Sequence, residues 1–230
     1  MSLFAIGDTH LSFGVDKPMD IFGGWSDYTE RLEKNWRAVV SDDDTVVIAG
    51  DISWAMKLSE AKADFAFLHS LPEKKLIMKG NHDYWWQTKK KLDLFLAENG
   101  FDTIEILFNN AFRIGDFAVC GSRGWFYDAQ TEADQKVILR EAGRIRLSTD
   151  CAKQLGGEPI LFLHYPPLTS EQCCREIVDT VKEAGIRRCY YGHLHGASTL
   201  FAYRGEFEEI KFDLISADFL GFCPKLVEKF

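Results

Sequence analysis

Five apolar runs that resemble β-strands each end in a polar motif, and this arrangement constrains the fold more than any other feature of the sequence. Segments with helical spacing of apolar residues separate the runs, a pattern typical of layered α/β domains. The strands are too numerous and too mixed for one parallel sheet. We therefore predict an α/β fold with two packed mixed β-sheets flanked by helices, a four-layer α-β-β-α sandwich. The runs are 3–6, 45–49, 76–78, 160–163 and 189–191.

Apolar residues that recur with helical spacing predict the helices between these strands. The first stripe, at 28–40, follows Asp27, and Glu30 stands three residues later, so we expect a capping box at its start. A glycine at position 185 is the expected stop of the last stripe. The other stripes predict helices over 58–71, 138–155 and 173–184.

Two further segments predict antiparallel strands. Residues 111–121 are expected to form a hairpin around Gly115-Asp116, and 198–220 two or three strands that turn near Arg204-Gly205. A chain of 230 residues with 46% hydrophobic content can bury one substantial core. Because there is no repeat, linker or low-complexity segment, we predict a single domain over residues 1–230.

Charge and cysteine usage limit the classes of partner and the compartment. A net charge of −8 argues against general affinity for nucleic acid, which depends on many Lys and Arg side chains. The six cysteines show no C-x-x-C spacing, so we expect reduced thiols in a cytoplasmic protein. No leader pattern or membrane-spanning run is present in the sequence, and no feature predicts an oligomeric state.

Five of the six histidines lie in the strand-end motifs, where the carboxyl ends of strands gather ligands. Carboxylate and amide oxygens in the same motifs complement these imidazoles, a mixture that favours a borderline metal such as Mn, Fe or Zn. Pairs two residues apart on extended backbone project from the same side and can chelate one ion. The histidines are His10, His82, His164, His193 and His195, and the oxygen donors are Asp8, Asp51 and Asn81.

The five motifs, in the order in which they occur, resemble those of the calcineurin-like metallophosphoesterases. Together they span residues 3–197. The quoted blocks are Asp8-Thr9-His10, Gly50-Asp51, Gly80-Asn81-His82-Asp83, His164 and Gly192-His193-Leu194-His195. The resemblance implies two metal ions. It implies that Asp8, His10 and His195 bind the first ion. It also implies that Asn81, His164 and His193 bind the second, and that Asp51 bridges the two.

The expected activity is hydrolysis of phosphate mono- or diesters, with a metal-bridging hydroxide attacking phosphorus. His82 directly follows the ligand Asn81 and points elsewhere, so we expect it to protonate the leaving oxygen, with Asp83 orienting its ring. Arg123 directly follows a β-type run, and Pro166 restricts Tyr165 to extended backbone beside His164, so we expect both side chains to contact the substrate. The expected partner is therefore a small phosphorylated substrate.

One motif departs from the phosphoprotein phosphatases, because Gly50-Asp51 lacks the following Asp and Arg of that branch. The ending Gly192-His193-Leu194-His195 instead resembles the bacterial and archaeal branch, which includes phosphodiesterases, nucleases and nucleotide pyrophosphatases. A nuclease or nucleotide pyrophosphatase is therefore one alternative. A non-catalytic scaffold that binds metal and a protein partner is another.

Overall fold

The computed structural model describes residues 1–125 and 131–230. The chain forms two compact units, the first made of Met1–Ile106 with Ile215–Phe230 and the second of Leu107–Leu214. The single domain over 1–230 stays a prediction. No helix among the described residues is long and apolar enough to cross a membrane.

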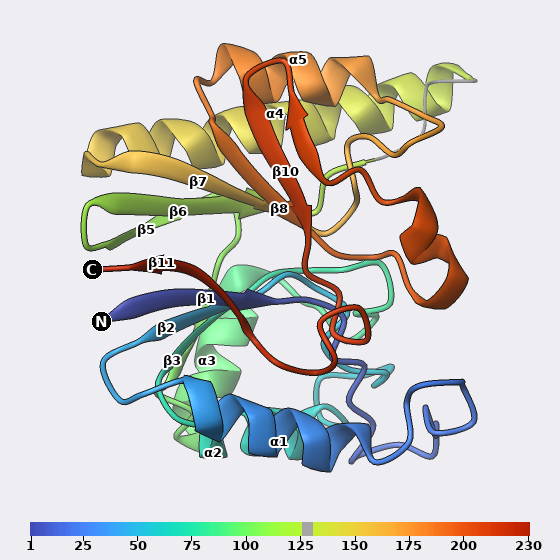
Figure 1. Ribbon diagram of the computed structural model, residues 1–230. Coiled ribbons are helices and arrows are strands. Elements are labelled where there is room, and N and C mark those ends of the chain that lie inside the picture. Colours follow the sequence, from blue (N-terminus) through green and yellow to red (C-terminus); the bar gives the residue numbers. More distant parts are fainter. Residues whose placement is uncertain (126–130) are drawn as a thin grey trace. The chain divides into compact units, whose positions relative to one another are not determined.

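The first unit contains a five-stranded sheet in the order β11-β1-β2-β3-β4. Strands β1 to β4 are parallel, and β11 pairs antiparallel with β1. Because right-handed crossovers between neighbouring parallel strands place their helices on the same face, α1 and α2 lie together below this sheet (Figure 1). The elements are β1 (Ser2–Ile6), α1 (Tyr28–Val39), β2 (Thr45–Ile48), α2 (Lys62–Ser70), β3 (Lys74–Ile77), α3 (Lys89–Asn99), β4 (Ile104–Ile106) and β11 (Lys225–Lys229).

The second unit contains a six-stranded sheet in the order β5-β6-β7-β8-β10-β9. Four central strands are parallel, and β5 and β9 pair antiparallel at the two edges. Helix α4 packs on β5, β6 and β7 and against α5, so both helices cover one face (Figure 1). The elements are β5 (Ala111–Ile114), β6 (Phe117–Ser122), α4 (Glu132–Leu155), β7 (Glu158–Leu163), α5 (Arg175–Glu183), β8 (Arg188–Tyr191), the 3-10 helix η1 (Gly196–Phe201), β9 (Gly205–Phe207) and β10 (Ile210–Leu214).

These elements confirm the predicted fold class, with two mixed sheets flanked by helices, and the five predicted strand runs. The hairpin over 111–121 is also confirmed. The cores are the central strands, and β2 is buried along its whole length. Helix α2 begins at Lys62, later than the apolar stripe predicted.

Two local predictions are wrong. Asp27 adopts a left-handed backbone, with φ of 50°, and its side chain makes no capping hydrogen bond, whereas a capping box forms at Thr131 and Asp134 of α4. The last hairpin turns at Glu208-Glu209, both at positive φ, instead of near Arg204-Gly205. Two consecutive left-handed residues match the twist of a tight hairpin, and charged side chains there masked the turn in the sequence.

Candidate metal centre

In the first unit, two loops that carry predicted ligands are joined by backbone hydrogen bonds. The loop after β1 holds Asp8 and His10, and the loop after β2 holds Asp51. The amide of Asp8 donates to the carbonyl of Gly50 at 2.9 Å, and that of His10 to the carbonyl of Asp51 at 3.0 Å. The amide of Leu11 adds a third such hydrogen bond, to the carbonyl of Ile52 at 2.8 Å. The parallel strands thus bring the first two motifs side by side.

These ligand positions have an unusual backbone. Asp8, His10 and Asp51 have φ of 59°, 45° and 49°, a left-handed region that costs side-chain-bearing residues free energy. The hydroxyl of Tyr28 donates to the carbonyl of His10 at 2.9 Å and helps to hold this conformation, and burial raises the pKa of Tyr28 to about 12. Strained backbone of this kind concentrates at functional sites.

The side chains at these positions are buried and close together. Asp8, His10 and Asp51 are 0%, 3% and 1% exposed. A carboxylate oxygen of Asp8 and a ring nitrogen of His10 lie within 4.8 Å of each other, and Nε2 of His10 is 3.8 Å from Oδ2 of Asp51. Buried carboxylates are costly unless they are paired or bind a metal. These donors therefore fit a transition metal ion.

The third motif contacts Asp51 directly. The amide of His82 donates to Oδ1 of Asp51 at 2.7 Å, while Oδ2 is the oxygen near His10. A Cβ on Gly80 would collide with the side chain and backbone of Asp51. Glycine is therefore required there, and Asn81 follows it half-buried.

Asp83 holds the loop after β2. Its buried carboxylate accepts hydrogen bonds from the amides of Asp51 at 2.9 Å, Ile52 at 2.8 Å and Ser53 at 3.3 Å. It also accepts from the amide of Gly80 at 2.7 Å and from Nε1 of Trp85 at 3.1 Å. These five donors give Asp83 a positioning role for the Asp51 loop. The orientation of the His82 ring by Asp83 stays a prediction.

Aromatic rings surround the two motif histidines of this unit, His10 and His82. Trp54 stacks on His10 with centroids 4.8 Å apart and lies 4.6 Å from the ring of His82. The edge of Trp25 meets His10 at 5.8 Å, and the hydroxyl of Tyr84 is 3.5 Å from Nδ1 of His82. The His82 ring is half-buried in this group, which leaves it accessible to a ligand.

In the second unit, the loops after β7 and β8 carry the remaining predicted ligands. His164 is fully buried, and its carbonyl accepts from the amide of Gly192 at 3.1 Å. Ring nitrogens of His164 and His193 lie within 4.8 Å of each other, and His193 has a φ of 74°. The amide of His195 donates to the hydroxyl of Ser198 at 2.8 Å. The loops after β7 and β8 therefore bring His164 and His193 together, and His193 lies on left-handed backbone.

The predicted substrate contacts lie beside these histidines. The ring of Tyr165 meets His193 edge-on at 4.5 Å, and the amides of His164 and Tyr165 both donate to the carbonyl of Arg123. The guanidinium of Arg123 lies 5.9 Å from the Tyr165 ring centroid. Its Nη2 is 3.5 Å from Oε1 of Glu141, a buried carboxylate of α4. Arg123 is therefore anchored from the protein interior.

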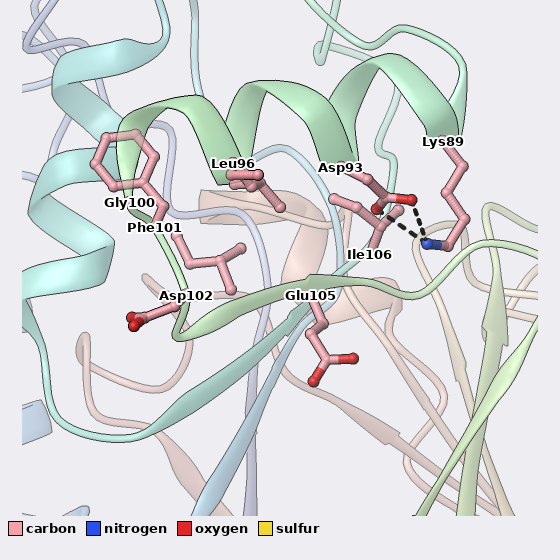
Figure 2. Close-up of a pocket in the computed structure, with 10 residues that line it drawn as sticks. Lys89, Asp93, Leu96, Gly100, Phe101, Asp102, Glu105 and Ile106 are labelled. Carbon is pink, nitrogen blue, oxygen red and sulfur yellow. Dashed lines mark hydrogen bonds and ion pairs between the residues drawn. The ribbon is translucent and has the colours of Figure 1, made fainter.

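Two cavities are lined by residues that do not belong to the predicted site. One of about 300 Å³ opens between α3 and β4 of the first unit, with Leu96, Phe101 and Ile106 as apolar lining and a Lys89–Asp93 ion pair at 2.7 Å (Figure 2). Another of about 490 Å³ in the second unit is lined by residues that include Leu168, Tyr203 and Phe207. Neither lining contains a predicted ligand.

Residues 1–197 match the family model of the calcineurin-like phosphoesterases, a span that contains all five motifs. The chain belongs to this family, and it is in general terms a metal-dependent hydrolase of phosphoric esters. Its assignment to the bacterial and archaeal branch stays a prediction. No curated protein matches the chain.

Solved structures share the fold at low sequence identity. The phosphopantetheinyl hydrolase PptH from Mycobacterium tuberculosis is 16% identical with a TM-score of 0.56, and the match covers 98% of this chain and 95% of that chain. A protein of unknown function from Aquifex aeolicus, AQ665, is 15% identical with a TM-score of 0.51 and the same coverage. The protein TT1561 of Thermus thermophilus is 14% identical with a TM-score of 0.53, over 84% of this chain and 81% of that chain.

Proposed function

We propose that this protein hydrolyses small phosphate mono- or diesters in the cytoplasm with two metal ions, Mn, Fe or Zn. The observation that carries the proposal is the cluster of Asp8, His10 and Asp51, which are buried, adjacent and on left-handed backbone. In the proposed arrangement, Asp8, His10 and His195 would hold the first ion, Asn81, His164 and His193 would hold the second, and Asp51 would contribute to both.

When bound, the two ions supply an activated water and neutralise charge on the phosphoryl group. The protein's own residues then position the substrate and move the proton. His82 is half-buried between Trp54 and Tyr84, with its amide fixed on Asp51, and it donates a proton to the leaving oxygen. Arg123 and Tyr165 bind the phosphoryl oxygens.

Family membership and the complete set of motifs support a catalytic function over a metal-binding scaffold. The net charge of −8 favours small substrates over nucleic acid. Likeness to the phosphopantetheinyl hydrolase at 16% identity supports the fold alone, so the proposal extends to the ester class and not to that substrate.

The test uses metal-stripped protein reloaded with Mn, Zn, Fe or Mg, with p-nitrophenyl phosphate and bis-p-nitrophenyl phosphate as substrates. Turnover should require metal, and Asp51→Asn should lower it on the order of 100-fold or more. His82→Ala should lower it at least about 100-fold, because general-acid catalysis typically contributes that much.

His69→Ala is the matched control, since this histidine lies in α2 and its Nδ1 contacts Thr103 at 2.9 Å, away from the motifs. It should keep wild-type turnover. A protein that binds two ions without hydrolysing either ester would favour the scaffold, and a protein that binds no metal would overturn the proposal.

A further inference from the structure

We propose that Asp64 is a positioning residue that holds two ligand loops of the first unit in their metal-binding conformation. It lies in α2, outside the five motifs, and is 0% exposed. The inference rests on the proposed function, because it assigns Asp64 to the support of the same metal site.

Each carboxylate oxygen of Asp64 accepts a hydrogen bond from a different loop. Oδ1 accepts from the amide of Phe13 at 2.7 Å, and Oδ2 accepts from the hydroxyl of Ser53. Phe13 stands three residues after His10, and Ser53 stands two residues after Asp51. One side chain therefore ties the loop after β1 and the loop after β2 to the same helix.

The hydrogen bond to Ser53 extends through a wider network. The hydroxyl of Ser53 also accepts from the amide of Ala55 at 3.1 Å, and the amide of Ser53 donates to Asp83 at 3.3 Å. Ser53 forms a bridge with Leu11, and the amide of Trp54 donates to the carbonyl of Leu11 at 2.9 Å. The loops that carry His10 and Asp51 are thus joined both to each other and, through Asp64, to α2.

A carboxylate at this place has a cost that packing alone does not explain. Burial raises the pKa of Asp64, and a leucine would fill the same buried face of α2, which also contains Phe65 and Leu68. Without Asp64, however, a backbone amide and a hydroxyl would lose their acceptor. Ligand positions at positive φ also need surrounding contacts to persist. Asp64 therefore stabilises the strained loops before an ion binds.

The experiment compares Asp64→Leu with Asp64→Asn by calorimetric titration of metal-free protein with Mn²⁺ and by ester hydrolysis. Leucine removes both acceptors and should weaken Mn²⁺ affinity about 10- to 100-fold, as loss of a group that orients metal ligands does. Asparagine keeps an oxygen for Phe13 and an amide that reaches Ser53, so its affinity should stay within about 3-fold of wild type. Ser53→Ala removes only one of the two hydrogen bonds, so its Mn²⁺ affinity should lie between those of Asp64→Leu and Asp64→Asn.

Asp44→Leu is the matched control. Asp44 is also a buried carboxylate of the first unit, and it accepts from the amide of Ser41 at 2.8 Å at the start of β2, the opposite end from Asp51. It should lower stability without lowering Mn²⁺ affinity. Two results would overturn the inference. One is an Mn²⁺ affinity of Asp64→Leu equal to that of Asp44→Leu. The other is an Mn²⁺ affinity of Asp64→Asn as low as that of Asp64→Leu.

Amide hydrogen exchange of the metal-free proteins provides a readout that does not depend on the proposed function. Asp64→Leu should lose protection in segments 8–13 and 50–55 relative to wild type, and Asp44→Leu should not. If wild-type protein binds none of Mn²⁺, Fe²⁺ and Zn²⁺, the proposed function fails, and amide exchange alone decides the loop-holding role. Unchanged protection in Asp64→Leu overturns that role in either case.

Discussion

In the first unit, the buried carboxylates that support the ligand loops accept hydrogen bonds from uncharged N–H and O–H groups. In the second unit, the buried carboxylate of Glu141 instead contacts two charged guanidinium groups. Asp64 and Asp83 bind backbone amides, a hydroxyl and an indole. Glu141 pairs with Arg123 and Arg144 and accepts from the hydroxyl of Ser122 at 3.0 Å.

The difference determines what happens when a carboxylate is lost. The amides and the indole that donate to Asp83 are buried, so each becomes an unsatisfied donor when this carboxylate is lost. The guanidinium groups can be hydrated, because the side chains of Arg123 and Arg144 are 26% and 41% exposed. We therefore expect the loops of the first unit to depend more strongly on their supporting carboxylates.

The largest expected effect is that of Asp83→Ala. It removes the acceptor of four backbone amides and the Trp85 indole, and each unsatisfied buried donor costs about 1–3 kcal/mol. With partial relaxation, the free energy of unfolding should fall by about 4 kcal/mol in urea denaturation. Asp93→Ala, which breaks an exposed pair with Lys89, should change it by less than about 0.5 kcal/mol. A cost for Asp83→Ala below that of Glu141→Leu would contradict the comparison.

Glu141→Leu should have the next largest effect. Breaking a buried ion pair commonly costs about 3–5 kcal/mol, but hydration of the two partly exposed arginines should reduce this to about 2 kcal/mol. Turnover should fall as well, because Arg123 loses its anchor beside Tyr165. Urea denaturation measures the first quantity and ester hydrolysis the second. Arg144→Ala is the control, and it should leave turnover near wild type since Arg123 keeps its contact with Glu141.

Burial also explains which elements of the fold can be predicted from the sequence. The strands that end in motifs were predictable because their apolar runs are continuous and buried. Helix α3 was missed because its buried positions are limited to Leu92 and Leu96, while Leu94 is 57% exposed. Strand β11 was missed because none of its residues is buried.

The residues of the candidate site likewise fall into those that the sequence reveals and those that it does not. The motifs located the predicted ligands because glycines and histidines at strand ends are informative. The supporting carboxylates Asp64 and Glu141 gave no such signal, since an acidic residue in a helical stripe is expected to face water. The role of Asp64 depends on Ser53 and Phe13, which are 11 and 51 residues away in sequence and meet it only in the tertiary structure.

Tyr28→Phe tests a single hydrogen bond to a ligand loop of the first unit. The variant keeps the ring and loses the 2.9 Å bond to the carbonyl of His10, so stability should fall by about 1 kcal/mol. Because His10 is held at positive φ, Mn²⁺ affinity should fall as well. Tyr203→Phe, which removes a hydroxyl that donates to the exposed residue Glu206 at 2.8 Å, is the matched control with unchanged affinity. Equal affinities of the two variants would contradict a role for Tyr28 at the site.

Ser198→Ala is the corresponding test in the second unit and should have the smallest effect. The hydroxyl of Ser198 accepts from the amide of His195 at 2.8 Å and donates to its carbonyl at 2.7 Å. Both residues are half-buried, so water can replace the hydroxyl, and stability should fall by about 0.5 kcal/mol in urea denaturation. Thr199→Ala, which removes a hydroxyl that donates to Gly196 in the same 3-10 helix, is the control. A loss above that of Tyr28→Phe would show that the second unit holds its ligand loop as rigidly as the first, which would contradict the proposed difference.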